Sequence, residues 1–235
     1  MQSLSIDRKF SDLPLAITMG EPGGINSEIF LKAIKEVNKI KNFIICDPSW
    51  IEKSLKFFNK NMPINILDEN LDTKENYINI FPTKKNVIFK LGKPNKRNNN
   101  AIIESIDKAI YFAKNKKISG IVTLPIYKKN LIEDGFKFPG HTEYLSYKDN
   151  SEPLMILMNK KLKVATVTTH IPIKKISESL NKSLAYLKLI SLVSTLSKSY
   201  AKISLSIINC SFGLKVSSIN FIPKLLQTDF SCCLR

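Results

Sequence analysis

The chain has 235 residues, of which 43% are hydrophobic and 24% charged, and these values are ordinary for a globular protein. Its length allows one large domain or two small ones. The apolar runs, such as residues 154–158, are too short to span a bilayer, and residues 1–12 lack the apolar core of a signal peptide. The sequence therefore indicates neither a membrane-spanning protein nor a secreted precursor.

The formal net charge of +16 is the unusual number in the composition. A charge of this size can indicate a nucleic-acid partner. The lysines, however, are scattered in short groups, arginine is scarce, and no stretch interleaves aromatic residues with arginines. We interpret the charge mainly as a solvated lysine surface and expect no nucleic-acid partner. Salt-sensitive binding to DNA or RNA with a steep slope would favour the contrary hypothesis.

The cysteines also narrow the class of protein. The chain has Cys46, Cys210, Cys232 and Cys233, which form no Cys-x-x-Cys pair. This pattern argues against a structural zinc site and against a disulfide framework. It suits a reducing compartment, so we expect a cytoplasmic protein.

Strand-like and helix-like patterns alternate along the chain, which predicts an α/β fold with a largely parallel sheet. We expect strands at residues 13–19, 42–46, 64–67, 87–89, 119–124, 154–159, 162–169 and 203–208, the one at 119–124 being buried. We expect helices over residues 26–37, 48–58, 101–114, 126–134 and 173–193. Asn26 or Ser27 can cap the first helix, and residues 159–161 are expected to form a turn.

A glycine-rich loop, Gly20-Glu21-Pro22-Gly23-Gly24, follows the first predicted strand and precedes a helix. Such a loop can present backbone N–H groups to an anion at a helix N-terminus. It matches neither the dinucleotide-binding pattern nor the P-loop. A purely structural turn explains it at least as well.

The two histidines stand in unusual segments. His141 lies in Phe138-Pro139-Gly140-His141-Thr142-Glu143, where Pro139 and Gly140 can form a turn that aims His141 and Thr142 at a ligand. An imidazole and a hydroxyl in succession can donate two hydrogen bonds to a phosphate or hydroxyl group. Glu143 can orient the imidazole or can simply be a carboxylate at a helix start. Spacing alone gives capping or surface roles for the histidines equal weight.

His170 lies in Thr168-Thr169-His170-Ile171-Pro172 and is expected to end a strand. Ligands collect at the carboxyl ends of strands in open α/β sheets, so this position suits a metal ligand. A catalytic divalent metal normally takes about three protein ligands. The chain contains no third histidine to complete such a set.

Taken together, four segments resemble the 4-hydroxythreonine-4-phosphate dehydrogenase family, whose members act in pyridoxal phosphate (vitamin B6) biosynthesis. The order and spacing of the segments also agree with the family. In the first segment the family typically has an aspartate and an alanine that this chain lacks. The matching segments are residues 17–25, 123–128, 135–145 and 164–172.

The resemblance implies a two-domain α/β/α fold like that of isocitrate and isopropylmalate dehydrogenases, with an active-site cleft and a homodimer. It implies that His141 and Thr142 contact a small phosphorylated amino-acid substrate. It also implies that His170 is one of three histidines that hold a divalent metal (Zn, Mg or Co) in a site shared across the dimer. The implied reaction is oxidation of the substrate hydroxyl by NAD or NADP, followed by decarboxylation. We assign no catalytic base and no cofactor-binding residue.

The resemblance stops after Asn209, where the family continues with a second metal histidine. We expect an N-terminal tail at residues 1–12, a family-like region at 13–209 and a divergent tail at 210–235. The simplest hypothesis is a truncated or frame-shifted copy that lacks the later metal and substrate ligands. Two alternatives stay open: a non-catalytic remnant that binds phosphate compounds or pairs with a full-length copy, and an enzyme for another phosphorylated 3-hydroxy acid.

Overall fold

The computed structural model describes residues 12–37, 40–158, 163–168, 170–181, 185–186, 188–190, 204–205 and 219–220. The chain divides into two compact units, Met1–Ser151 and Glu152–Arg235. No helix of the described residues is long and apolar enough to cross a membrane.

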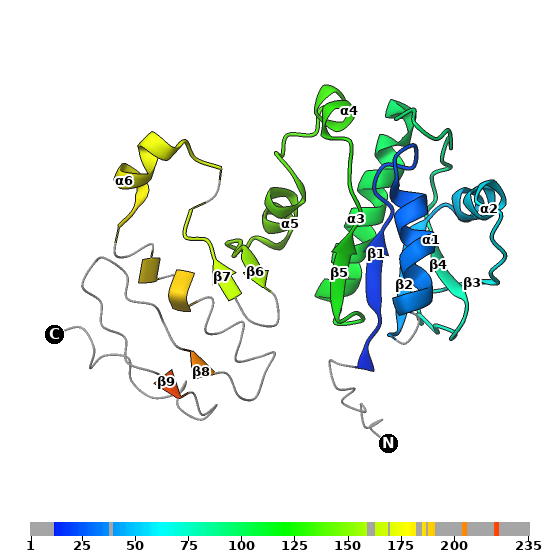
Figure 1. The fold of residues 1–235 in the computed structure, drawn as a ribbon, viewed down its shortest axis with the longest axis horizontal. Helices are drawn as coiled ribbons and strands as arrows, with labels where there is room; N and C mark the ends of the chain where they lie inside the picture. The colour runs from blue at the N-terminus through cyan, green and yellow to red at the C-terminus, as the bar shows by residue number, and fades with distance from the viewer. Residues whose placement is uncertain are drawn as a thin grey trace, which may run out of the picture. The chain divides into compact units, whose positions relative to one another are not determined.

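The first unit is built on a parallel sheet with the strand order β3-β4-β2-β1-β5 (Figure 1). Its strands are β1 (Leu15–Thr18), β2 (Asn42–Cys46), β3 (Ile64–Ile66), β4 (Ile78–Pro82) and β5 (Gly120–Thr123). Its helices are α1 (Asn26–Val37), α2 (Pro48–Phe57), α3 (Asn99–Lys114), α4 (Lys128–Glu133) and α5 (His141–Asp149). The predicted α/β fold with a parallel sheet is confirmed.

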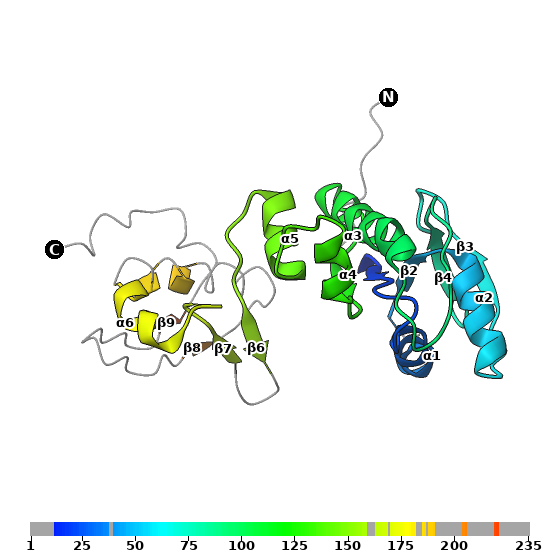
Figure 2. The same ribbon diagram turned by 90° about the horizontal axis from the view of Figure 1, so that it is seen from above.

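Helices cover both faces of the sheet, with α3 on one face and α1 on the other (Figure 2). Alternate strand residues point to opposite faces. Thus Phe43 packs with Phe112 of α3 in one cluster, whereas Ile44 packs with Leu31 of α1 in the other. Burying a large apolar side chain of this kind contributes roughly 1.5–3 kcal/mol. These two clusters pack the helices against the sheet.

One predicted strand is absent and another was missed. Residues 87–89 form no strand, because Asp47 accepts a hydrogen bond from the Val87 amide (2.8 Å) and Asn98 accepts one from the Ile88 amide (2.8 Å). Those amides bond to side chains instead of a neighbouring strand. Asp47 also accepts from the Ser49 amide (2.9 Å) and so caps α2. The strand that the sequence missed is β4, which lies between β3 and β2 in the sheet.

β5 was expected to be buried, and this prediction is wrong. The strand pairs with β1 alone among the described strands, and Val122 is 43% exposed. β5 is therefore an edge strand of this sheet, although its apolar sequence is typical of a strand that is covered on both faces.

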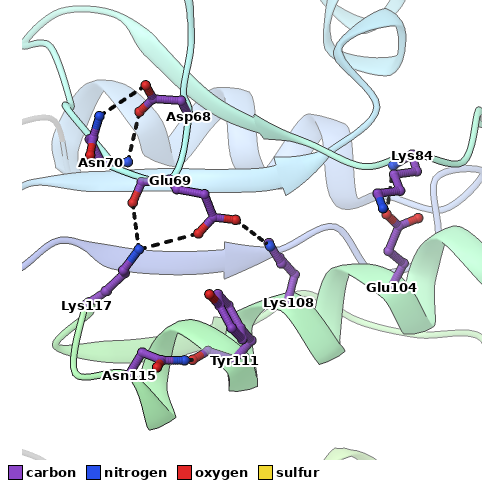
Figure 3. Close-up of polar contacts among 9 residues, drawn as sticks. All are labelled: Asp68, Glu69, Asn70, Lys84, Glu104, Lys108, Tyr111, Asn115 and Lys117. Atoms are coloured by element: carbon purple, nitrogen blue, oxygen red, sulfur yellow. Dashed lines mark hydrogen bonds and ion pairs between the residues drawn. The ribbon is translucent and has the colours of Figure 1, made fainter.

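A polar cluster joins the loop after β3 to α3 on the surface of this unit (Figure 3). The Glu69 carboxylate pairs with Lys108 at 2.7 Å and with Lys117 at 3.4 Å. Lys108 also lies over the Tyr111 ring, 4.5 Å from its centroid. Some of the abundant lysines therefore have defined structural partners and are not only solvated.

The second unit contains an antiparallel pair, β6 (Ile156–Met158) and β7 (Lys163–Ala165), as predicted. Further short elements are a 3₁₀ turn (Ile173–Lys175), α6 (Ile176–Ser179) and the antiparallel pair β8 (Ser204–Leu205) and β9 (Ile219–Asn220). The turn at 159–161 and the cysteines beyond Cys46 lie outside the described residues.

Two predictions in the second unit are wrong. The strand expected to end on His170 ends at Ala165. The helix expected over 173–193 is interrupted, because α6 ends at Ser179 and Leu180 is extended, with ψ 115°. The Ser179 hydroxyl donates to the Lys175 carbonyl at 2.8 Å, a local bond that competes with helix propagation. Residues 191–193 lie outside the described residues.

Candidate functional site

The glycine-rich loop after β1 is closed by its own contacts. The amides of Glu21, Gly23 and Gly24 donate to Pro125 O (2.9 Å), Glu21 Oε1 (3.0 Å) and Glu21 O (3.1 Å). Gly20 has φ +62°, and a Cβ there would lie 2.4 Å from Pro125 O, so only glycine fits. Three amides that an anion would need are thus already used. The loop is a structural turn that ties β1 to the segment after β5.

Two polar side chains stabilise this turn from inside. The Asn26 amide donates to the carbonyls of Met19 (3.3 Å), Glu21 (3.1 Å) and Pro125 (2.7 Å). Glu21 is buried, and burial raises the pKa of its carboxyl, although hydrogen bonding from the Gly23 amide opposes the shift. The sequence suggested Asn26 as a cap, but its amide links the two strand ends instead.

His141 begins α5, directly after Gly140, so the turn expected at Pro139 and Gly140 leads into a helix that the sequence did not predict. Aromatic packing fixes this approach: the rings of Phe136 and Phe138 each lie 5.1 Å from the ring of Tyr144, between centroids. Because Tyr144 is one turn beyond His141 on the same helix, the packed rings position the imidazole.

The His141 side chain is half-buried, and its Nε2 atom is buried without a hydrogen-bond partner among the described residues. Burial lowers the pKa of His141, and the nearby positive charge of Lys128 lowers it further. Both effects favour the neutral imidazole, whose Nε2 has no partner among the described residues. Thr142 is exposed beside it, and Glu143 stands in the first turn of the helix.

Lys128 approaches the same helix start from α4. A Cβ built on Gly140 would lie 3.4 Å from Lys128 Nζ and 3.5 Å from Glu143 Oε2. The ammonium group and the carboxylate therefore both reach the residue that precedes His141. Lys128 is the last residue of the matching segment 123–128, and the sequence alone assigns it no role. A lysine shortly after the carboxyl end of a parallel strand was the available signal.

A second set of contacts anchors α5 to α3. The Tyr144 hydroxyl donates to Asp107 Oδ1 at 2.6 Å, and Lys148 Nζ lies 3.0 Å from the same oxygen. Both partners of Asp107 come from α5, on successive turns. The helix that carries His141 and Thr142 is thus attached to the main helix of the first unit.

His170 lies in the second unit, whereas His141 and Thr142 lie in the first. It is exposed and has φ +59°, a left-handed conformation that is uncommon outside glycine. Within the described residues no three His, Cys, Asp or Glu side chains gather to hold a metal ion. The prediction that His170 binds a metal thus rests on the sequence resemblance.

Comparison with known proteins identifies the family. The sequence matches the family described as "Pyridoxal phosphate biosynthetic protein PdxA" over residues 38–211. The chain belongs to this family. Two relatives named 4-hydroxythreonine-4-phosphate dehydrogenase agree with this assignment. The protein from Sulfurihydrogenibium sp. (strain YO3AOP1) is 35% identical over 72% of this chain and 53% of its own length. That from Wigglesworthia glossinidia brevipalpis is 32% identical over 77% of this chain and 56% of its own length.

A solved structure gives the same fold. The crystal structure of a 4-hydroxythreonine-4-phosphate dehydrogenase from Burkholderia phymatum has a TM-score of 0.72 and 24% identity, covering 79% of this chain and 58% of that chain. The predicted dehydrogenase-like α/β fold is thereby confirmed. The chain spans about half the length of the curated PdxA relatives that it matches, 53% and 56% in the two cases above.

Proposed function

We propose that this chain binds 4-hydroxythreonine 4-phosphate through His141 and Thr142, as part of an oxidoreductase of pyridoxal phosphate biosynthesis. One observation supports this proposal most directly. His141 stands at the start of α5, and its buried Nε2 has no partner among the described residues. A buried polar atom of this kind costs free energy unless a ligand or water satisfies it. The names of the relatives, 4-hydroxythreonine-4-phosphate dehydrogenase, supply the expected ligand.

The chemistry that these residues perform is recognition and orientation. A neutral imidazole presents either a donor or an acceptor at Nε2, and the Thr142 hydroxyl does both. Together they can hold a phosphate or hydroxyl oxygen beside α5. A nicotinamide cofactor, NAD or NADP, would accept the hydride when bound. The closed Gly20–Gly24 loop does not fit its pyrophosphate, so we assign no cofactor residue.

The proposed enzyme would also require a divalent metal. His170 would be the contribution of this chain to a divalent metal site in a homodimer. Among the described residues no three His, Cys, Asp or Glu side chains gather at one place, so the donor set does not fit a metal by itself. We derive no step through the metal. Size-exclusion chromatography with light scattering tests the dimer, and metal analysis tests whether the purified chain retains an ion.

Calorimetric titration of the full chain with 4-hydroxythreonine 4-phosphate tests the binding role. Thr142→Val and His141→Asn should each weaken binding by about tenfold or more, because a hydrogen bond to a charged group is lost. Thr73→Val, in a loop of the same unit, is the matched control and should leave the affinity unchanged. Equal affinities for all four proteins would refute the assignment.

A spectrophotometric assay for NADH or NADPH, with substrate and divalent metal present, tests the oxidoreductase role. Metal-dependent reduction of the nicotinamide supports the dehydrogenase. Binding without reduction favours the alternative of a non-catalytic protein that binds phosphate compounds.

A further inference from the structure

We infer that Lys128 is a further substrate-binding residue, whose ammonium group holds the phosphate of the ligand at the start of α5. The inference rests on the proposed function, since it adds a third side chain to the pair formed by His141 and Thr142. It starts from the place of Lys128 in the fold. Lys128 is the first residue of α4 and follows the carboxyl end of β5. Ligands of open parallel sheets bind beyond this end of the strands.

The side chain of Lys128 extends toward α5. Its Nζ and Cε atoms lie 3.4 and 3.6 Å from the position of a Cβ on Gly140. The ammonium group is therefore next to the backbone that enters the helix, with His141 and Thr142 as the next two residues. Lys128 itself is exposed, so a ligand can reach it from solvent.

This position is electrostatically unusual for a cation. The N-terminus of a helix carries a partial positive charge and favours anions. A lysine there adds positive charge where the helix already repels it, and it also opposes protonation of His141. Glu143, in the first turn, supplies one negative charge near the same glycine. A phosphate dianion would neutralise the remaining positive potential and would accept hydrogen bonds from Lys128, His141 and Thr142.

The neighbouring lysine provides a matched control. Lys129 is also exposed, but its charge acts on Glu133 at the far end of α4. Lys128 and Lys129 therefore share composition, helix and solvent exposure and differ in which partner they face. A general effect of net charge on phosphate binding would appear equally in both variants.

The test is calorimetric titration of the full chain with inorganic phosphate and with 4-hydroxythreonine 4-phosphate, at low and high salt. Lys128→Met should weaken binding of both ligands by about tenfold or more, and should reduce the salt dependence. Lys128→Arg should retain most of the affinity, whereas Lys129→Met should match the unaltered chain. Urea unfolding of each variant establishes that it is folded.

The outcomes distinguish a failure of the inference about Lys128 from a failure of the proposed function. If the unaltered chain binds and Lys128→Met binds equally well, the inference is overturned and the proposed function stands. If Lys128→Met lowers the free energy of unfolding but leaves both affinities unchanged, Lys128 stabilises the fold near Glu143 and does not bind the ligand. The inference then fails as well. If the substrate affinity falls while that for inorganic phosphate does not, Lys128 recognises another group and the phosphate assignment is wrong. If the unaltered chain binds neither ligand, the proposed function fails together with the inference.

Discussion

The Tyr144 hydroxyl donates a 2.6 Å hydrogen bond to Asp107 Oδ1, and this bond joins α5, the helix of the candidate site, to α3, the helix that packs on the central sheet. Tyr144 is buried, and its ring packs against Phe136 and Phe138 from the turn that precedes His141. One side chain thus connects the scaffold, the turn and the site helix.

Removal of this hydroxyl should therefore destabilise the first unit. Tyr144→Phe keeps the ring contacts but leaves Asp107 without one donor, so we expect a loss of about 1 kcal/mol in the free energy of unfolding. Urea denaturation followed by circular dichroism measures it. Tyr147→Phe is the matched control, because Tyr147 is 69% exposed on the same helix. An equal effect of both substitutions would contradict the role of the hydrogen bond.

The same hydrogen bond gives a pH dependence at alkaline pH. Burial and the bond to Asp107 raise the pKa of Tyr144 to about 12, from an ordinary value of 10. Between these values the folded state retains a proton that the unfolded state releases. The stabilisation is therefore present below pH 10 and lost as the pH rises toward 12. Tyr144→Phe should remove this contribution to the decrease in the free energy of unfolding between pH 10 and 12. An unchanged decrease in the variant would contradict the role of Tyr144.

The sequence predicts the elements whose hydrophobic pattern is local. β2 was predicted with its observed bounds, and α3 to within two residues, because apolar periodicity determines both. The strand expected at 87–89 failed for a non-local reason, since its amides bond to Asp47 and Asn98. No pattern within residues 87–89 reveals those partners.

The candidate site likewise has parts that the sequence predicts and parts that it does not. The turn before His141 could be predicted from Pro139 and Gly140, whereas helix α5, which starts there, was missed. The approach of Lys128 to Gly140 was not readable, because it depends on how the aromatic turn folds back between α4 and α5. The prediction that a strand ends on His170 was wrong because β7 ends at Ala165, five residues earlier. The β-branched run before His170 does not reveal where the strand ends.

The titration of His141 offers a direct check of its surroundings. Burial and Lys128 lower the pKa of His141 from its ordinary value of 6.5. Below pH 6.5 the unfolded chain takes up a proton that the folded chain resists, so the stability linked to His141 is present above pH 6.5 and is lost as the pH falls. Proton NMR of the imidazole C2–H should show a midpoint below 6.5, with the signal assigned from its absence in His141→Asn. A midpoint at or above 6.5 would be inconsistent with a buried Nε2.

The Glu69 cluster should contribute little to stability in spite of its several contacts. The side chains of Glu69 and Lys108 are 49% and 30% exposed, and solvent screens their attraction. Glu69→Gln should cost less than about 1 kcal/mol, and the cost should shrink at about 1 M salt. Urea unfolding at two salt concentrations measures this, with exposed Glu36→Gln as the control. A large, salt-independent loss would show that the cluster in Figure 3 supports the fold more than its exposure suggests.

The closed loop after β1 should tolerate no side chain at Gly23. A Cβ there would lie 2.5 Å from Lys93 O and 2.9 Å from Lys93 C, and these are backbone atoms that cannot rotate away. Gly92 also donates to Gly23 O at 2.8 Å, which holds the two segments together. Gly23→Ala must therefore move the chain near Lys93, at a cost of about 1–3 kcal/mol.

Gly24→Ala is the natural comparison for Gly23→Ala, since its Cβ would meet Glu21 O at 3.3 Å and needs only a small adjustment. Thermal unfolding should show a clear decrease in Tm for Gly23→Ala and a smaller one for Gly24→Ala. If the loop instead opened to bind an anion, Gly23→Ala would weaken phosphate binding without lowering Tm. That result would reverse its assignment as a structural turn, because the amides of Gly23 and Gly24 would then have to leave Glu21.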